Sequence, residues 1–273
     1  MKNKINIIFD IDDTLVHTEY NKTYHDKYIR INNEIQYIIT NKSLTFIRDY
    51  TYDLLNYCLN YFNVGFWSTG TEKHILPIIK KLIPNKNDYN KINLLLCRHR
   101  YNPQNTIYKN ILTKKKYKIS DYNYYPIKPL DLLFENPDFK KKFNKNNTIL
   151  IDDSAFHVSI NPNNSIFLPT FCYQHNDNIL FELLIFLDKN KNKKNIKNLI
   201  KNFYDYNNNK SKCYHKKIKK LNLSFGDLVK YKNKDVYIIK NSKNKVNIYL
   251  IDDKKILFNI PRNEIIIPEF YTI

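Results

Sequence analysis

The sequence of 273 residues predicts an α/β layer fold followed by a small β-barrel. Three observations support this prediction. Short apolar runs alternate with amphipathic segments up to residue 187, a Lys- and Asn-rich segment covers 188–221, and five short β runs fill 222–273. Strands that alternate with helices pair in parallel through crossover connections. We therefore expect a larger domain over 1–187, a basic linker and a barrel.

The elements of the first domain follow from apolar spacing and residue type. Strands are predicted over residues 5–9, 64–68, 92–97 and 148–154, which are short runs rich in apolar residues. Helices are predicted over residues 48–62, 71–83 and 177–187. Thr71 is the expected N-cap of the second helix, and Pro77 weakens the prediction for its first half.

The last 50 residues contain β runs separated by turn-forming segments. The predicted strands cover residues 227–231, 236–240, 246–251, 256–260 and 264–268. The segment resembles SH3-like barrels of the Tudor type. Asp253 stands where a Tudor domain often has an aromatic cage residue, so we expect a protein or RNA docking module rather than a reader of methylated residues.

Charge and cysteine usage limit the partners and the compartment. The net charge of +19 indicates an anionic partner such as nucleic acid or a phosphorylated protein, although a bias toward AT-rich codons explains the Lys and Asn content equally well. The cysteines show no CxxC spacing, which predicts no disulfide framework and a reducing compartment; they are Cys58, Cys97, Cys172 and Cys213. No run reaches about 18 apolar residues. We expect an intracellular protein, nuclear or cytoplasmic, without a membrane partner.

Two predicted strands end in pairs of carboxylates. Asp10 and Asp12 follow the first strand, and Asp152 and Asp153 follow the last. In parallel sheets the ligand crevice lies at the carboxyl ends of the strands, so neighbouring strands would bring these four side chains together. Like charges at this density need a cation or a proton. Carboxylate-rich sites suit Mg²⁺, which keeps water ligands that a phosphate can displace.

This arrangement predicts phosphoryl transfer to an aspartate. Asp10 would be the nucleophile and a metal ligand, and Asp12 would protonate the leaving oxygen and then deprotonate water. Ser68, at the end of a strand, is the expected hydroxyl donor to the phosphate. Lys128 is the expected positive charge.

Four segments together resemble the haloacid dehalogenase-type phosphatases. They are FDIDDTLVHT, FWSTGT, IKPLDLL and ILIDDS, in that order along residues 5–187. They are most similar to the branch that dephosphorylates the C-terminal domain of RNA polymerase II, the nuclear-LIM-interactor-interacting-factor-like (NLI-interacting-factor-like) phosphatases. That branch has a run matched here by Asp10, Asp12, Thr14, Leu15, Val16 and His17, and further matches are Arg48, Pro77 and Arg98.

The resemblance implies a Rossmann-like sheet and Mg²⁺ held by Asp10, the backbone carbonyl of Asp12 and a residue of the fourth motif, Asp152 or Asp153. The branch often has Asp-Asn in that motif, so metal affinity can differ here. Substrate contacts are expected from three residues, Thr14, Thr69 and Arg98. The segment between Arg98 and Lys128 is longer than expected, so peptide preference does not carry over.

Less specific interpretations exist for most of these residues. The aspartates could form caps and turns, Ser68 could cap a helix, Lys128 could match by chance, and Arg98 could form an exposed salt bridge. His17 is expected to be a hydrogen-bonded structural residue. Phe66 and Trp67 are expected in the core.

The predicted function is that of a Mg²⁺-dependent phosphatase of phosphoserine or phosphothreonine in proteins, with the RNA polymerase II tail as the candidate substrate. A phosphatase of nucleic-acid 3′ ends is the alternative that the charge favours. A non-catalytic scaffold of the same fold is a further alternative, which the intact Asp10 and Asp12 oppose.

Overall fold

The computed structural model describes most of the first 203 residues and the strands beyond them. Its described residues are 4–20, 36–39, 43–102, 105–120, 126–171, 177–192, 196, 200, 203, 228–232, 234–241, 245–250, 255–261 and 265–266. Cys58 and Cys97 are buried free thiols, whereas Cys172 and Cys213 lie outside the described residues. Among the described helices, none is long and apolar enough to cross a membrane.

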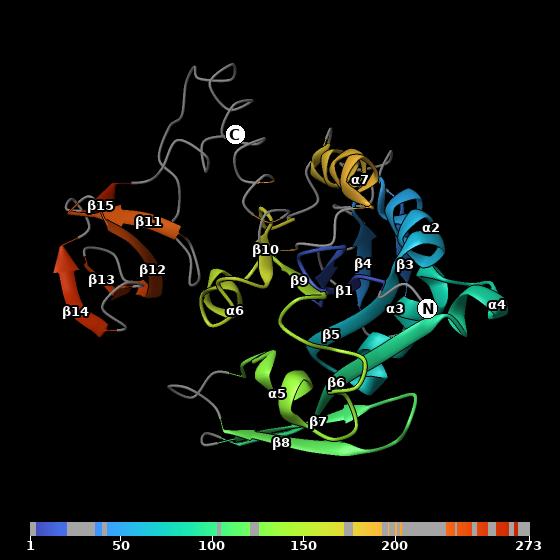
Figure 1. Cartoon of the computed structure of the whole chain (residues 1–273). Coiled ribbons are helices and arrows are strands. Elements are labelled where there is room, and N and C mark those ends of the chain that lie inside the picture. Colours follow the sequence, from blue (N-terminus) through green and yellow to red (C-terminus); the bar gives the residue numbers. More distant parts are fainter. Residues whose placement is uncertain are drawn as a thin grey trace.

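The first domain is built on a seven-stranded sheet in the order β10-β9-β1-β5-β6-β7-β8 (Figure 1). The five strands from β10 to β6 pair in parallel, and β7 and β8 continue the sheet in antiparallel. The strands are β1 (Asn6–Phe9), β5 (Asn63–Thr71), β6 (Ile92–Asn102), β7 (Asn105–Asn110), β8 (Lys116–Ser120), β9 (Thr148–Asp152) and β10 (Ser165–Phe167). The predicted α/β class with a parallel sheet is confirmed.

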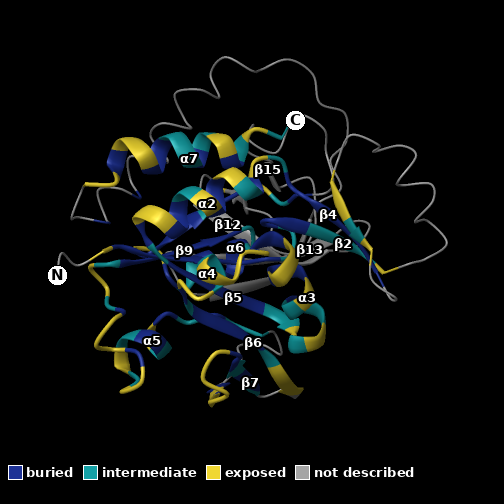
Figure 2. Cartoon of the chain, turned by 90° about the vertical axis from the view of Figure 1, so that its right-hand side faces the viewer, coloured by how far each residue is buried: buried dark blue, intermediate teal, exposed yellow. Residues whose placement is uncertain are grey.

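Helices cover both faces of this sheet. The helices are α2 (Thr51–Tyr61), α3 (Glu72–Leu82), α4 (Lys86–Tyr89), α5 (Asp131–Glu135), α6 (Ala155–Ser159) and α7 (Ile179–Asn190). Side chains of α2, α3 and α7 pack with Ile7 and Phe9 on one face, and α5 packs with Ile8 and Trp67 on the other. The strands are therefore buried while the outer sides of α2 and α7 are exposed (Figure 2). Phe66 and Trp67 are both fully buried, as predicted.

Several elements were not predicted. A separate three-stranded sheet contains β2 (Val16–Glu19), β4 (Leu44–Ile47) and β3 (Tyr37–Ile39). The unexpectedly long segment after Arg98 contains the end of β6 and the strands β7 and β8, which extend the main sheet. Helix α3 begins directly after Thr71, but no side-chain cap bond is made, and the helix continues through Pro77.

Burial continues past residue 187. Helix α7 ends at Asn190, and Ile196, Ile200 and Phe203 are buried in the same core as α7. The Phe203 ring lies 5.1 Å from the Phe186 ring, edge-on. At least this part of the predicted linker belongs to the core. The rest of it, 204–221, lies outside the described residues.

The C-terminal β runs form a five-stranded antiparallel sheet in the order β14-β13-β12-β11-β15. Its strands are β11 (Leu228–Tyr231), β12 (Lys234–Asn241), β13 (Lys245–Leu250), β14 (Lys255–Pro261) and β15 (Ile265–Ile266). All five match predicted strands to within a few residues. The likeness to a Tudor barrel stays a prediction, and Asp253 lies outside the described residues.

A buried arginine ties the segment after β1 to the start of α7. The Arg48 side chain is 1% exposed, its Nη2 lies 2.8 Å from Asp177 Oδ2, and its Nη1 donates to the Thr14 carbonyl at 3.0 Å. Its guanidinium also lies over the Phe171 ring at 5.4 Å. Breaking a buried ion pair leaves an uncompensated charge, so Arg48 is a structural anchor for the aspartate-rich turn.

We expect Arg48→Met to lower the free energy of unfolding by about 3–5 kcal/mol, because Asp177 then keeps a charge without its partner. Urea unfolding measures this loss. The matched control is Lys115→Ala, which breaks the exposed Lys115–Asp138 pair and should cost less than about 1 kcal/mol. Equal small losses in both variants would contradict the anchoring role.

Candidate active site

The two acidic strand ends meet in the middle of the sheet. Strands β1 and β9 pair in parallel with Phe9 opposite Ile151, so Asp10 and Asp152 leave the sheet at the same level. The Asp10 N–H donates to the Ile151 carbonyl at 2.8 Å, which fixes this alignment. Carboxylate oxygens of Asp10, Asp152 and Asp153 lie within 4.8 Å of one another. Three of the four carboxylates that were predicted to converge therefore lie together, and the fourth, Asp12, does not join them.

The chain turns sharply after Asp12. Asp13 has a left-handed backbone with φ of 62°, which Asp tolerates better than most residues, and its N–H donates to the Val16 carbonyl at 2.6 Å. The Asp12 carboxylate is bonded toward β5 and α3 instead of joining the cluster. Ser68 Oγ donates to its Oδ2 at 3.3 Å, and His74 Nε2 lies 2.7 Å from its Oδ1. The Asp12 side chain therefore lies apart from the three clustered carboxylates.

Lys128 is a buried positive charge between two of the carboxylates. Its side chain is fully buried, and Nζ donates to Asp10 Oδ1 at 2.5 Å and to Asp152 Oδ2 at 2.8 Å. Burial alone would lower the pKa of Lys128, but these two carboxylates raise it above its usual range. Asn161 holds the Lys128 loop by donating to the Lys128 carbonyl at 2.8 Å and accepting from the Leu130 N–H at 2.9 Å.

Asp152 is fully engaged by protein donors. Besides Lys128, it accepts from the Ser154 N–H at 2.8 Å, and His157 Nδ1 lies 3.2 Å from both of its oxygens. His157 Nε2 in turn lies 3.1 Å from the Pro126 carbonyl in the Lys128 loop. Burial would raise the pKa of Asp152, but Lys128 and His157 hold it well below its usual range. Asp152 is thus the ionised partner of Lys128.

Asp153 is less completely engaged. Thr14 Oγ1 donates to Asp153 Oδ1 at 3.0 Å, and the Asp153 N–H donates back to Thr14 Oγ1 at 3.0 Å. Thr14 is fully buried and orients Asp153, while its predicted contact with the substrate stays a prediction. Burial, with the negative charges of Asp152 and Asp13, raises the pKa of Asp153 to about 7.

The negative charge of the cluster exceeds the positive charge of Lys128, so the cluster needs bound protons or a further cation. Burial raises the pKa of Asp10 well above its usual range, Lys128 opposes this, and Asp152 and Asp153 add to it. Three carboxylates and one ammonium leave two negative charges, which favours either bound protons or a divalent cation. Two oxygens that bind one Mg²⁺ at about 2.1 Å lie at most about 4.2 Å apart, so small side-chain shifts would close the set. The residues fit a divalent ion.

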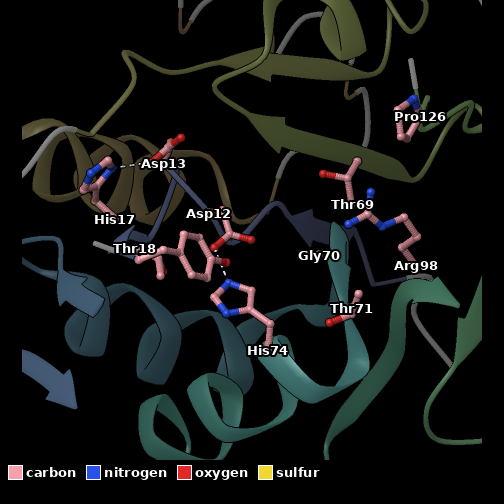
Figure 3. A pocket seen from close by; sticks show the side chains of 11 residues that line it. Asp12, Asp13, His17, Thr18, Thr69, Gly70, Thr71, His74, Arg98 and Pro126 are labelled. Atoms are coloured by element: carbon pink, nitrogen blue, oxygen red, sulfur yellow. Dashed lines mark hydrogen bonds and ion pairs between the residues drawn. The ribbon is translucent and has the colours of Figure 1, made fainter. Parts of the chain in front are cut away.

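A cavity of about 430 Å³ opens beside Asp12 (Figure 3). Thr69 and Arg98, both predicted substrate contacts, line it, and so do His74 and Pro126. His17 Nδ1 lies 2.6 Å from Asp13 Oδ1, in agreement with a hydrogen-bonded role for His17. Ser68 is 1% exposed and its Oγ accepts from the Gly70 N–H at 2.8 Å, so it lies at the base of the site.

Sequence reasoning did not find His74 or His157. Each contacts an aspartate of the site from the first turns of the helix that follows a motif strand. The sequence feature that could have indicated these contacts is a histidine within about six residues of the end of a motif strand. It was weak because the partner of His74 is 62 residues away in the sequence.

The raised pKa of Asp153 predicts how the metal-free protein responds to pH. A carboxyl group whose folded pKa lies above its unfolded value stabilises the fold below the unfolded pKa of about 4, and this stability is lost as pH rises through about 7. Asp153→Asn cannot titrate at this position. We therefore expect its free energy of unfolding, relative to that of the wild type, to increase as the pH rises from about 4 to about 7, by at most about 1.4 kcal/mol per pH unit. Urea unfolding in chelator measures it. A difference that stays constant from about pH 5 to about pH 8 would contradict this role of Asp153.

One family model and two solved structures are similar to this chain. The model of the NLI interacting factor-like phosphatase family matches residues 5–197. Among solved structures, Fcp1, described as an essential RNA polymerase II CTD phosphatase, is 13% identical with a TM-score of 0.42, and the match covers 79% of this chain and 55% of that one. A fission yeast Fcp1 variant bound to beryllium fluoride is 11% identical with a TM-score of 0.41, and the match covers 70% and 53%.

The chain thus spans about half the length of these two solved proteins. A search of curated protein sequences finds no significant match. The family model covers well over half of the chain. Its range includes Ser68, Lys128 and the four aspartates predicted for the site, which are Asp10, Asp12, Asp152 and Asp153. The chain belongs to the NLI interacting factor-like phosphatase family.

Proposed function

We propose that this protein is a phosphatase that hydrolyses phosphoserine or phosphothreonine in proteins through a phosphoryl group carried on Asp10, with Mg²⁺ as its cofactor. The observation that supports this most strongly is the charge of the buried cluster: Lys128 neutralises one of three carboxylates and leaves two charges for a divalent ion. Asp10 and Asp153 would hold Mg²⁺, with the Asp12 carbonyl as the third protein ligand that family resemblance suggests. When bound, Mg²⁺ supplies positive charge that offsets the charge of the phosphate.

In the first step Asp10 attacks phosphorus. Its Oδ1 is held by Lys128, so Oδ2 is the oxygen available for attack. The bond between phosphorus and the leaving oxygen breaks, and that oxygen takes a proton from Asp12. The Ser68 hydroxyl, 3.3 Å from Asp12, and the Lys128 ammonium, bonded to Asp10, would donate to the phosphoryl oxygens.

In the second step water attacks the phosphoryl group on Asp10. Asp12, now a carboxylate, takes a proton from this water, and the bond between phosphorus and Asp10 breaks. Phosphate leaves, and both aspartates return to their starting states. Because one residue alternates as acid and base, the Asp12 carboxylate needs a fixed position near Asp10 and must not itself bind the cation.

The cavity leaves room for groups of the substrate next to the phosphate. It lies open beside Asp12, and Arg98 and Thr69 line it where groups next to the phosphorylated residue would lie. The family and the printed descriptions of the solved proteins support the RNA polymerase II tail as candidate. The net charge of +19 favours the alternative, a phosphatase of nucleic-acid 3′ ends.

We expect the protein to release phosphate from p-nitrophenyl phosphate and from phosphoserine peptides in a Mg²⁺-dependent reaction, and Asp10→Asn to be inactive. Asp12→Asn, which cannot accept a proton from water, should accumulate one phosphoryl group that hydroxylamine removes, as measured by intact mass. Preference for a 3′-phosphorylated oligonucleotide would favour the alternative. Equal activity of Asp10→Asn and wild type would refute the mechanism, and a wild type without turnover on any substrate would favour the non-catalytic scaffold.

The basic segment 188–221 and the C-terminal sheet are proposed to contact RNA or protein. If the positive charge is functional, the affinity of the full chain for single-stranded RNA should fall steeply with salt, with a slope of about −0.7 per phosphate contact. Fluorescence anisotropy measures this slope. RNA binding that is absent at low salt would instead attribute the charge to codon bias.

A further inference from the structure

One histidine contacts the carboxylate that transfers protons. His74 lies in the first turn of α3, and its Nε2 is 2.7 Å from Asp12 Oδ1 (Figure 3). The His74 side chain is 13% exposed and that of Asp12 is 32% exposed. The pair is thus at the edge of the cavity, with the histidine on the protein side and the carboxylate nearer to the solvent.

Close packing keeps the His74 ring in this place. A Cβ atom at Gly70 would lie 3.0 Å from Ser68 Oγ and 3.1 Å from His74 Cδ2, so the absence of a side chain at Gly70 lets both residues approach Asp12. On another side, the Tyr20 ring lies 5.7 Å from the His74 ring. The ring is therefore limited to few orientations, which is the condition for it to orient another group.

The two oxygens of Asp12 have different neighbours. Oδ1 is next to His74 Nε2, and Oδ2 accepts from Ser68 Oγ, the residue proposed to contact the phosphate. We propose that His74 is a positioning residue: its Nε2–H donates to Oδ1, so the proton that Asp12 transfers is carried on Oδ2, facing the phosphoryl group. This inference rests on the proposed acid–base role of Asp12.

The proton then follows one path in both steps. As the bond from phosphorus to the leaving oxygen breaks, its electron pair stays on that oxygen, which takes the proton from Oδ2. When water attacks the phosphoryl group on Asp10, the water proton returns to Oδ2 and the electron pair of the broken bond returns to Asp10. Without His74, Asp12 can rotate and place its proton on either oxygen, so fewer encounters are productive.

This role predicts a loss that depends on the leaving group. The kinetic constant kcat/KM reports the steps up to departure of the leaving group. Phenol has a pKa of about 10, so its departure from phenyl phosphate needs the proton from Asp12. The more acidic p-nitrophenol, of nearly the same size, needs it much less. We expect His74→Ala in the full chain to lower kcat/KM by about 10- to 100-fold for phenyl phosphate and by less than about 3-fold for p-nitrophenyl phosphate.

Two conservative variants separate positioning from packing. The amide nitrogen of His74→Gln reaches the place of Nε2, whereas that of His74→Asn is shorter and reaches only the place of Nδ1. Gln should therefore restore most of the activity on phenyl phosphate and Asn should not, even if His74→Ala fails to fold. His99→Ala removes an exposed histidine of β6 outside the cavity and should match the wild type on both esters.

The contradicting results are distinct. Equal losses on both esters, or equal activity of the Gln and Asn variants, would overturn the positioning role of His74 while leaving the phosphatase mechanism in place. If instead Asp12→Asn lowers kcat/KM equally for both esters, or the wild type hydrolyses neither, the proposed role of Asp12 fails, and the inference about His74 fails with it.

Discussion

The structure of the site depends on one buried ammonium group. Lys128 lies between Asp10 and Asp152 and is completely excluded from solvent. A lone buried carboxylate would take up a proton, and two side by side would repel each other, so neither would be a ready nucleophile. Lys128 allows Asp152 to stay ionised and orients Asp10 through one oxygen. The charge that remains on Asp10 and Asp153 then matches a divalent cation.

The rest of the domain serves to hold these groups in register. Parallel pairing of β1 with β9 brings Asp10 level with Asp152, and the left-handed turn at Asp13 separates Asp12 from the cluster. Two polar contacts fix this turn. Arg48 donates to the Thr14 carbonyl, and the Thr14 hydroxyl donates to Asp153. Since Asp10, Asp152, Arg48 and Thr14 are buried and paired, the site is assembled before any substrate binds.

Local sequence patterns predicted the buried strands, because the spacing and type of neighbouring residues determine them. Apolar runs such as 5–9 and 148–154 marked buried parallel strands, and the carboxylates at their ends marked the site. The β2 strand, Val16–Glu19, was missed because only one of its four residues is buried. Contacts distant in sequence, such as Asp12 with His74, had no local signal. The contact of Thr14 with Asp153 was not predicted, because it depends on how two strands pair.

The most direct test of the account is a crystal structure of the protein with Mn²⁺ in place of Mg²⁺, with the ion located by its anomalous scattering. The account predicts one ion bound by Asp10 and Asp153 at about 2.1–2.2 Å, with Lys128 still bonded to Asp152 and with Asp12 contributing no side-chain oxygen. An ion bound by Asp152 after displacement of Lys128, or no ion at the cluster at millimolar Mn²⁺, would contradict it.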